Sequence, residues 1–106
     1  MDAFKLMIVT AAGVEEAERI ARKVVEKRLA GCVNIIPKIR SIYRWQGKVE
    51  EDREAMLLIK TDAKHLPKLK KRIKKMHSYD VPEILVFDID DGDDDYLKWL
   101  KSSLHL

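Results

Sequence analysis

The sequence predicts an α+β domain with the ferredoxin-like βαββαβ order, extended by a long β-hairpin and a C-terminal helix. Three observations support this prediction. Apolar and polar residues alternate with period two along Val33–Lys60, which is typical of half-buried strands. Two stretches with helical spacing, Val14–Ala30 and Ala63–Met76, flank this segment, and a short apolar run lies outside each of them. This order is the split βαβ pattern, in which right-handed crossovers place both main helices on one face of an antiparallel sheet.

The first strand and the first helix follow from adjacent patterns. Phe4–Thr10 is a short apolar run typical of a buried strand, and residues 11–13 form a turn. Val14–Ala30 carries one apolar face at helical spacing. Gly31 stands where a helix C-cap favours glycine, so we expect the helix to end there. The apolar face consists of Ala17, Ile20, Ala21, Val24 and Leu29.

The second and third strands form the predicted hairpin. The odd-numbered positions of Val33–Trp45 are nearly all apolar, and Gln46-Gly47 offers a turn before Lys48–Lys60 runs back. Pro37 cannot donate a ladder hydrogen bond, so it favours an edge strand or a bulge. The buried face of the return strand should consist of Ala55, Leu57 and Ile59.

This hairpin is too long for its own domain. About thirteen residues per strand at about 3.3 Å each span roughly 43 Å, whereas a globule of this chain length is about 35 Å across. The tip, which carries Tyr43 and Trp45, should therefore overhang the core and need cover from another subunit. We expect an obligate oligomer with its function at or near the subunit interfaces.

Two helices and one strand complete the predicted fold. Ala63–Met76 is a helix with Pro67 in its first turn, and Glu83–Ile89 is the last main strand. Asp93–Leu104 is a third helix, whose acidic first turn suits a helix N-terminus. The residues expected to face inward are Leu66, Leu69, Ile73 and Met76 in the second helix and Leu97, Leu100 and Leu104 in the third.

Composition narrows the class of protein. The chain has 106 residues and no linker or repeat, so we expect one domain, residues 1–106. A single cysteine excludes an intrachain disulfide and fits a reducing compartment. The segment Met1–Lys5 lacks a signal-peptide shape, and no apolar run approaches a membrane span, so we expect a cytoplasmic protein without membrane contact. Charged residues at 37%, with one Asn and one Gln, are typical of a thermostable protein.

The sequence contains one basic and one acidic cluster, and we interpret neither as a binding site. The net charge of +3 and the absence of interleaved aromatic residues argue against nucleic-acid binding by the basic second helix, whose cationic face we interpret as solvated. The acidic run Asp88–Asp95 departs from a calcium-loop pattern because position six would be Asp93 rather than glycine. The basic face consists of Lys64, Lys68, Lys70, Lys71, Arg72, Lys74 and Lys75.

Cys32 and His77 are the candidate metal ligands. Cys32 is either a small buried residue or a soft ligand for copper or zinc. One thiolate cannot fill a coordination shell, so it would need His77 or copies from neighbouring subunits. His77 is either a helix C-terminal histidine or an imidazole that binds a cation or moves protons beside Tyr79 and Glu83. We expect His65 and His105 to face solvent.

Further aromatic and charged residues could line a ligand cleft. Tryptophans are most often core or interface anchors, yet aromatic walls with a carboxylate and a lysine would suit a small polar ligand. The sequence shows no catalytic set of a nucleophile, a general base and an orienting group at a recognisable spacing. We therefore predict that the protein is not an enzyme. An enzyme acting through His77 and Glu83 is the alternative. The cleft candidates are Trp45, Glu54, Lys60, Tyr79, Glu83 and Trp99.

Five motifs occur in an order that resembles the CutA family, the divalent-cation tolerance proteins. The resemblance spans about Ile8 to Leu104. It implies a ferredoxin-like homotrimer that is cytoplasmic and linked to tolerance of copper and other divalent metals. The motifs are Gly31-Cys32-Val33-Asn34, Tyr43-x-Trp45-x-Gly47-Lys48, Lys60-Thr61, His77-x-Tyr79-x-Val81-Pro82-Glu83-Ile84 and Asp95-Tyr96-Leu97-x-Trp99-Leu100.

The resemblance also implies roles for single residues. Cys32 and His77 match positions proposed for copper ligation, and the six cleft candidates match positions gathered near the inter-subunit cleft. Our leading hypothesis is a homotrimer that binds a divalent metal ion, with copper as the leading candidate. The alternative is a PII-like signalling or scaffold module that binds a small anion or metabolite between subunits through Lys60 and Trp45.

Overall fold

The computed structural model describes residues 3–106, so Met1 and Asp2 of the expected N-terminal segment lie outside the described residues. Four strands form one antiparallel sheet in the order β2-β3-β1-β4. This arrangement confirms the predicted α+β fold with its ferredoxin-like order. The elements are β1 (Phe4–Ala11), α1 (Val14–Glu26), β2 (Cys32–Trp45), β3 (Lys48–Asp62), the 3-10 turn η1 (Ala63–His65), α2 (Leu66–Met76), β4 (Ile84–Asp88) and α3 (Asp94–Ser103).

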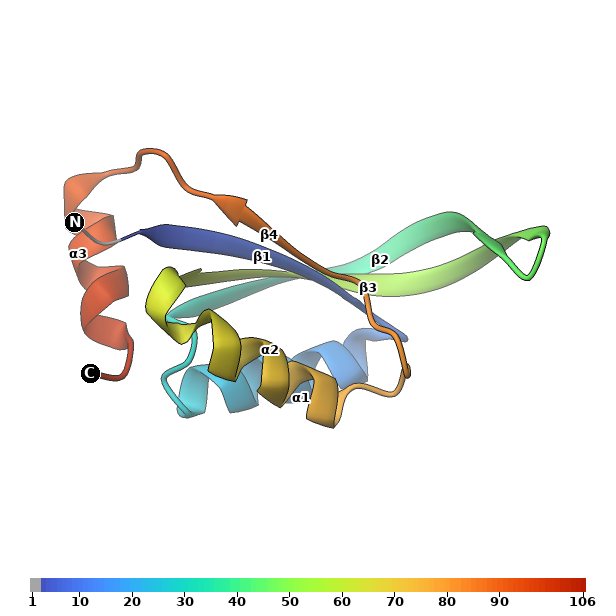
Figure 1. The fold of residues 1–106 in the computed structure, drawn as a ribbon, viewed down its shortest axis with the longest axis horizontal. Coiled ribbons are helices and arrows are strands. Elements are labelled where there is room, and N and C mark those ends of the chain that lie inside the picture. The colour runs from blue at the N-terminus through green and yellow to red at the C-terminus, as the bar shows by residue number, and fades with distance from the viewer. Residues whose placement is uncertain (1–2) are drawn as a thin grey trace.

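The core lies between one face of the sheet and two helices. Figure 1 shows α1 and α2 on the same side of the sheet, as predicted, and α3 across its end. Aliphatic side chains from both layers are removed from solvent, and each contributes about 1.5–3 kcal/mol to stability. The larger buried side chains are Met7 and Val9 from β1, Leu57 and Ile59 from β3, Ile20 and Val24 from α1, and Leu69 and Ile73 from α2.

The hairpin overhangs the core, as expected. Its strands stay paired as far as Trp45 and Lys48, and the tip in Figure 1 projects well beyond both helices. The molecule consequently measures 45 Å along its longest axis but only 25 and 22 Å across. Pro37 lies on the edge strand, and the pairing shifts register between Ile36 and Ile39, so both features expected of this proline are present.

The first helix ends earlier than its pattern predicted. It stops at Glu26, and Arg28, with φ of 60°, adopts the left-handed conformation that we had assigned to a glycine cap. The predicted role of Gly31 as the cap is therefore wrong. A Cβ atom on Gly31 would lie 2.5 Å from Cδ1 of Leu100, so glycine is needed here for close packing of α3.

The second face of the sheet has no helix over it. The pairing register places Leu6, Ile8, Ile36, Met56, Leu58, Leu85 and Phe87 together on this side, with Cys32 and Lys60 at one end of it. We call this surface the open face. Leu85 is 50% exposed and Phe87 47% exposed, although both belong to a strand. The open face is therefore an apolar surface without a partner in one chain.

Candidate functional site

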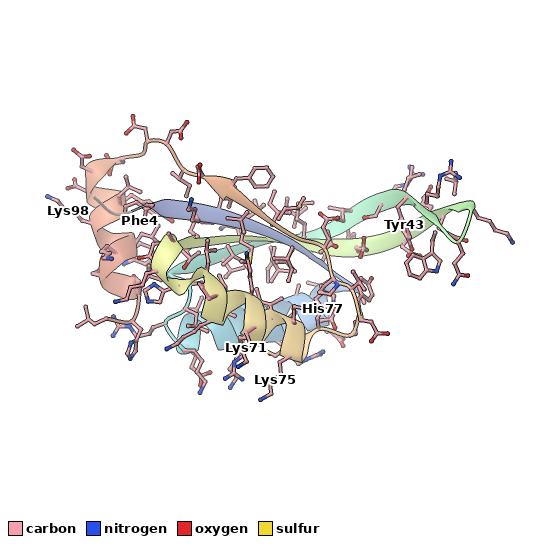
Figure 2. All side chains as sticks on the ribbon, in the orientation of Figure 1. Phe4, Tyr43, Lys71, Lys75, His77 and Lys98 are labelled. Carbon is pink, nitrogen blue, oxygen red and sulfur yellow. The ribbon has the colours of Figure 1, made fainter. Side chains whose placement is uncertain are left out.

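His77 is a buried residue whose two ring nitrogens both bind the backbone. It caps the C-terminus of α2, and Figure 2 shows it at that end of the helix. Its Nδ1 accepts a hydrogen bond from the Tyr79 amide at 3.0 Å, which places the proton of the neutral ring on Nε2. Nε2 then donates to the Thr10 carbonyl at 2.7 Å. The ring thus has no free lone pair for a metal ion.

Glu16 is a buried carboxylate next to His77. Oε1 accepts from the Ala12 amide at 3.0 Å, and Oε2 accepts from the Ser78 amide at 2.9 Å. Burial by itself raises the pKa of Glu16, but hydrogen bonds from Ser78 and Ala12 outweigh it, so the net pKa is lowered. Glu16 therefore stays ionised and ties the start of α1 to the loop after α2. Sequence reasoning missed it, although an acidic residue in a first helical turn is a usable signal.

Tyr79 and Glu54 complete this cluster, which lies at the base of the hairpin. The Tyr79 hydroxyl donates to Oε2 of Glu54 at 2.9 Å, and its ring centroid lies 4.8 Å from that of His77. Burial and then the neighbouring Glu54 raise the pKa of Tyr79 well above its usual value, so the phenol remains a donor. In the described part of the chain, every buried side-chain donor or acceptor has a partner. The cluster is a closed network that fixes the hairpin base.

Cys32 lies elsewhere, on the open face beside α3. Burial and then the nearby Cys32 thiol raise the pKa of Tyr96, whose ring centroid is 5.5 Å from that of Trp99. Cys32 pairs with Lys60, whereas the strand residue Thr10, which His77 binds, pairs with Met56. Four residues along β3 separate these pairs by about 13 Å.

The expected combination of Cys32 with His77 therefore does not form within one chain. Among residues 3–106, no group of three or more His, Cys, Asp and Glu side chains is arranged to hold a metal ion. Within the described residues, Cys32 therefore belongs to no set of three such ligands.

Most of the cleft candidates are also apart in one chain. Trp45 is 58% exposed at the hairpin tip, and Trp99 lies on α3. Lys60 donates to the Asn34 side chain at one end of the open face, and Glu83 is exposed just before β4. Only Glu54 and Tyr79 meet. A cleft shared between subunits stays a prediction.

His65 was expected to face solvent, and this expectation is wrong. The residue is 6% exposed, with Nδ1 2.5 Å from Oδ1 of Asp62 and Nε2 2.6 Å from the His105 carbonyl. Lys101 of α3 donates to Oδ2 of Asp62 at 3.2 Å. Burial raises the pKa of Asp62, but hydrogen bonds from His65 and Lys101 outweigh it and the pKa is lowered. Asp62 also caps η1, and an Asp three residues before His is the signal that could have revealed this cluster.

Comparisons with known proteins agree with the fold and extend over nearly the whole chain. The family model described as CutA1 divalent ion tolerance protein matches residues 5–103. The divalent-cation tolerance protein CutA of Thermus thermophilus is 48% identical over 99 residues, which cover 93% of this chain and 96% of that protein. The mouse protein CutA is 46% identical over 87% of this chain, which spans only 52% of the mouse protein.

A solved structure gives the same result. The Thermus thermophilus divalent cation tolerance protein superposes with a TM-score of 0.94 at 47% identity, covering 96% of this chain and 99% of that one. Relatives differ in compartment, since the Arabidopsis thaliana protein is named chloroplastic and the Archaeoglobus fulgidus protein periplasmic. None of the helices within residues 3–106 has the length and apolar character needed to cross a membrane. The match along residues 5–103 and the identity of nearly one half show that the chain belongs to the CutA1 divalent ion tolerance protein family.

Proposed function

We propose that this protein is a non-enzymatic homotrimer that binds divalent metal ions and thereby takes part in metal-ion tolerance. Copper is the leading candidate metal. Membership of the divalent ion tolerance family supports the role in tolerance. One observation of the structure carries the assembly: the open face and the overhanging hairpin leave apolar surface that one chain does not cover.

The exposed surface favours assembly through copies of this chain. Large contiguous apolar patches on a soluble domain mark interaction sites. The hairpin adds Ile42, Trp45 and Val49, which are 58–67% exposed. A hairpin that docks on a different surface of the next copy makes a heterologous contact, and such contacts form a ring when the rotation from copy to copy closes. Three copies are the number that the sequence resemblance implies.

Assembly would also supply the metal ligands that one chain lacks. Cys32 lies on the open face, so copies that meet there would bring further ligands, such as a second thiol, to it. Thiolates suit copper(I) and zinc. His77 would bind a metal only after giving up its hydrogen bond to Tyr79 or Thr10, so we place Cys32 ahead of it as a ligand.

Equilibrium dialysis of the assembled protein against zinc(II), and in parallel against copper held as copper(I) by a reductant, tests this function. Cys32→Ser should lose most of the bound metal, and His77→Ala should keep the wild-type stoichiometry if it remains folded. Copper binding that is equal in wild type and Cys32→Ser would remove Cys32 from the site. An absence of binding in all three proteins would end the metal proposal.

The alternative function is a module that binds a small anion between subunits. Lys60 favours it, since this cation lies at one end of the largely apolar open face and donates a hydrogen bond to the neighbouring Asn34 side chain. An anionic metabolite that co-purifies with wild type but not with Lys60→Gln would support this function over metal binding.

A further inference from the structure

A basic groove on the helical side of the molecule is the feature that the proposed function leaves unused. It lies between the end of α1, the outer face of η1 and α2, and residues 105–106, and encloses about 500 Å³. This volume is within the range of small-molecule sites. We infer that the groove binds a linear oligophosphate anion. Its cationic lining consists of Lys27, Lys64, Lys68, Lys71, Arg72 and Lys75.

The cations of the groove form no ion pairs within the described residues. None of these six forms an ion pair with another residue of the described range 3–106, and no Asp or Glu lines the groove. Other cations of the described range do have a carboxylate partner, as Lys5 has Asp88 and Arg40 has Glu51. The whole chain is nearly balanced, with 21 basic and 18 acidic residues. The groove therefore gathers six cations without an ion pair, whereas the second hollow of the helical side has only Lys70 and Lys74 as cations in its lining.

This concentration of charge opposes the stability of α2. Lys68 and Arg72, like Lys71 and Lys75, stand four residues apart on a helix, where like charges repel. The helices α1 and α3 begin with acidic residues that favour the helix dipole, whereas α2 has none and places Lys68 in its first turn. A bound anion would relieve both effects, because it neutralises the cations where they repel one another.

The shape of the cationic row favours an oligophosphate over other anions. In Figure 2 the Lys71 and Lys75 side chains extend from α2 away from the sheet. Lys68, Lys71 and Lys75 follow one stripe of the helix, which covers about 10 Å at 1.5 Å per residue. A chain of several phosphates can meet such a row with successive charges. Among the described residues, no Phe, Tyr or Trp lines the groove, and the ring of His65 is held by Asp62 and by the His105 carbonyl, so the groove offers a nucleic-acid strand a poor stacking platform.

The floor of the groove is fixed before any ligand arrives. His65 is held on both ring nitrogens, by Asp62 and by the His105 carbonyl. The groove is lined from the helical layer, whereas the proposed subunit contacts use the open face and the hairpin. If the protein proved not to form an oligomer or not to bind metal, the inference of an anion site would still stand. If the groove bound no oligophosphate, the proposed function would likewise still stand.

Calorimetric titration of the whole protein with inorganic tripolyphosphate at about 0.1 M salt tests the inference. We expect one saturable site per chain. Lys68→Gln combined with Lys71→Gln should raise Kd by about tenfold or more. The matched control combines Lys70→Gln with Lys74→Gln, which removes equal charge from the same helix beside a different hollow. The control should change Kd by less than about twofold.

Three outcomes would overturn the inference. The first is an absence of saturable heat with wild type. The second is equal weakening by both double variants, since that would show attraction to net charge alone. The third is a short single-stranded oligonucleotide that binds more tightly than tripolyphosphate, which would make the groove a nucleic-acid surface.

Discussion

Asp62, the last residue of β3, links the sheet to the C-terminal helix. Its carboxylate accepts from His65 and from Lys101 of α3, and it is only 2% exposed. Asp62→Ala should lower the free energy of unfolding by about 1–3 kcal/mol, because it leaves the backbone amide and the buried ring of His65 without their acceptor. Urea unfolding at neutral pH measures the loss. Asp91→Ala, which removes an exposed carboxylate, is the control and should be nearly neutral.

The stabilisation by Asp62 should depend on pH in one direction. Its pKa in the folded protein lies below the usual 3.8, so the folded state binds this proton less readily than the unfolded state. The contribution is complete above pH 3.8 and is lost as pH falls through the lowered value. The difference in stability between wild type and Asp62→Asn should therefore shrink only under acidic conditions. A difference that disappeared between pH 8 and pH 6 would contradict this assignment.

Gly31 provides a test of packing at one residue. A Cβ there would lie 2.5 Å from Cδ1 and 3.4 Å from the carbonyl oxygen of Leu100, which is buried. Gly31→Ala should cost about 1–3 kcal/mol through overpacking. Gly13→Ala is the matched control, because nothing lies within 4 Å of its added Cβ. Thermal unfolding compares the two, and equal melting temperatures would show that α3 moves freely to make room.

Single-residue environments were the least predictable part of the site. The sequence indicated His77 as a candidate, but its two backbone hydrogen bonds depend on Thr10, which is 67 residues away. Likewise, His65 becomes buried through the backbone of His105, 40 residues later. Contacts of this range have no local pattern, so spacing could not reveal them. Tyr79 and Glu54 were named as cleft residues, yet their direct pairing was not foreseen.

At the scale of elements, the hairpin was the most predictable part of the fold. Alternation, the turn pair and Pro37 lie close together in sequence, and together they set strand length, edge position and bulge. The end of α1 was not predictable in this way. Its pattern of apolar residues continues to Leu29, but Arg28 turns left-handed and the chain leaves the helix at Glu26.

The two-residue turn of the hairpin gives a prediction for that element. Gln46 has φ of 50° and Gly47 has φ of 79°, so both adopt left-handed conformations. Gly47→Ala should destabilise the hairpin by about 1 kcal/mol. Gln46→Asn should be neutral or stabilising, because Asn accepts this conformation more readily. Chemical denaturation of the two variants measures both effects, and a more stable Gly47→Ala protein would contradict the turn geometry.

At the scale of the whole molecule, the open face predicts where assembly can be broken. Leu85 lies on this face and is half exposed, so Leu85→Lys should place a charge inside the proposed interface without disturbing the core. We expect dissociation at protein concentrations about tenfold or more above those of wild type. Val81→Lys, at a position 84% exposed before β4, is the control. Equal assembly of both variants in analytical ultracentrifugation would move the interface elsewhere.

The two sides of the molecule have different chemistry. The open face is largely apolar and the hairpin carries exposed apolar side chains at its tip, whereas the helical side carries a basic groove whose cations form no ion pair within residues 3–106. Assembly should therefore cover the first side and leave the second in contact with solvent.

Sedimentation equilibrium in dilute physiological buffer tests the central claim, that the hairpin and the open face need sister copies. The chain mass is 12.3 kDa. We predict a single species at three times that mass, with no folded monomer across the micromolar range. A well-folded monomer of 12.3 kDa would contradict the account, because the open face would then be stable without cover.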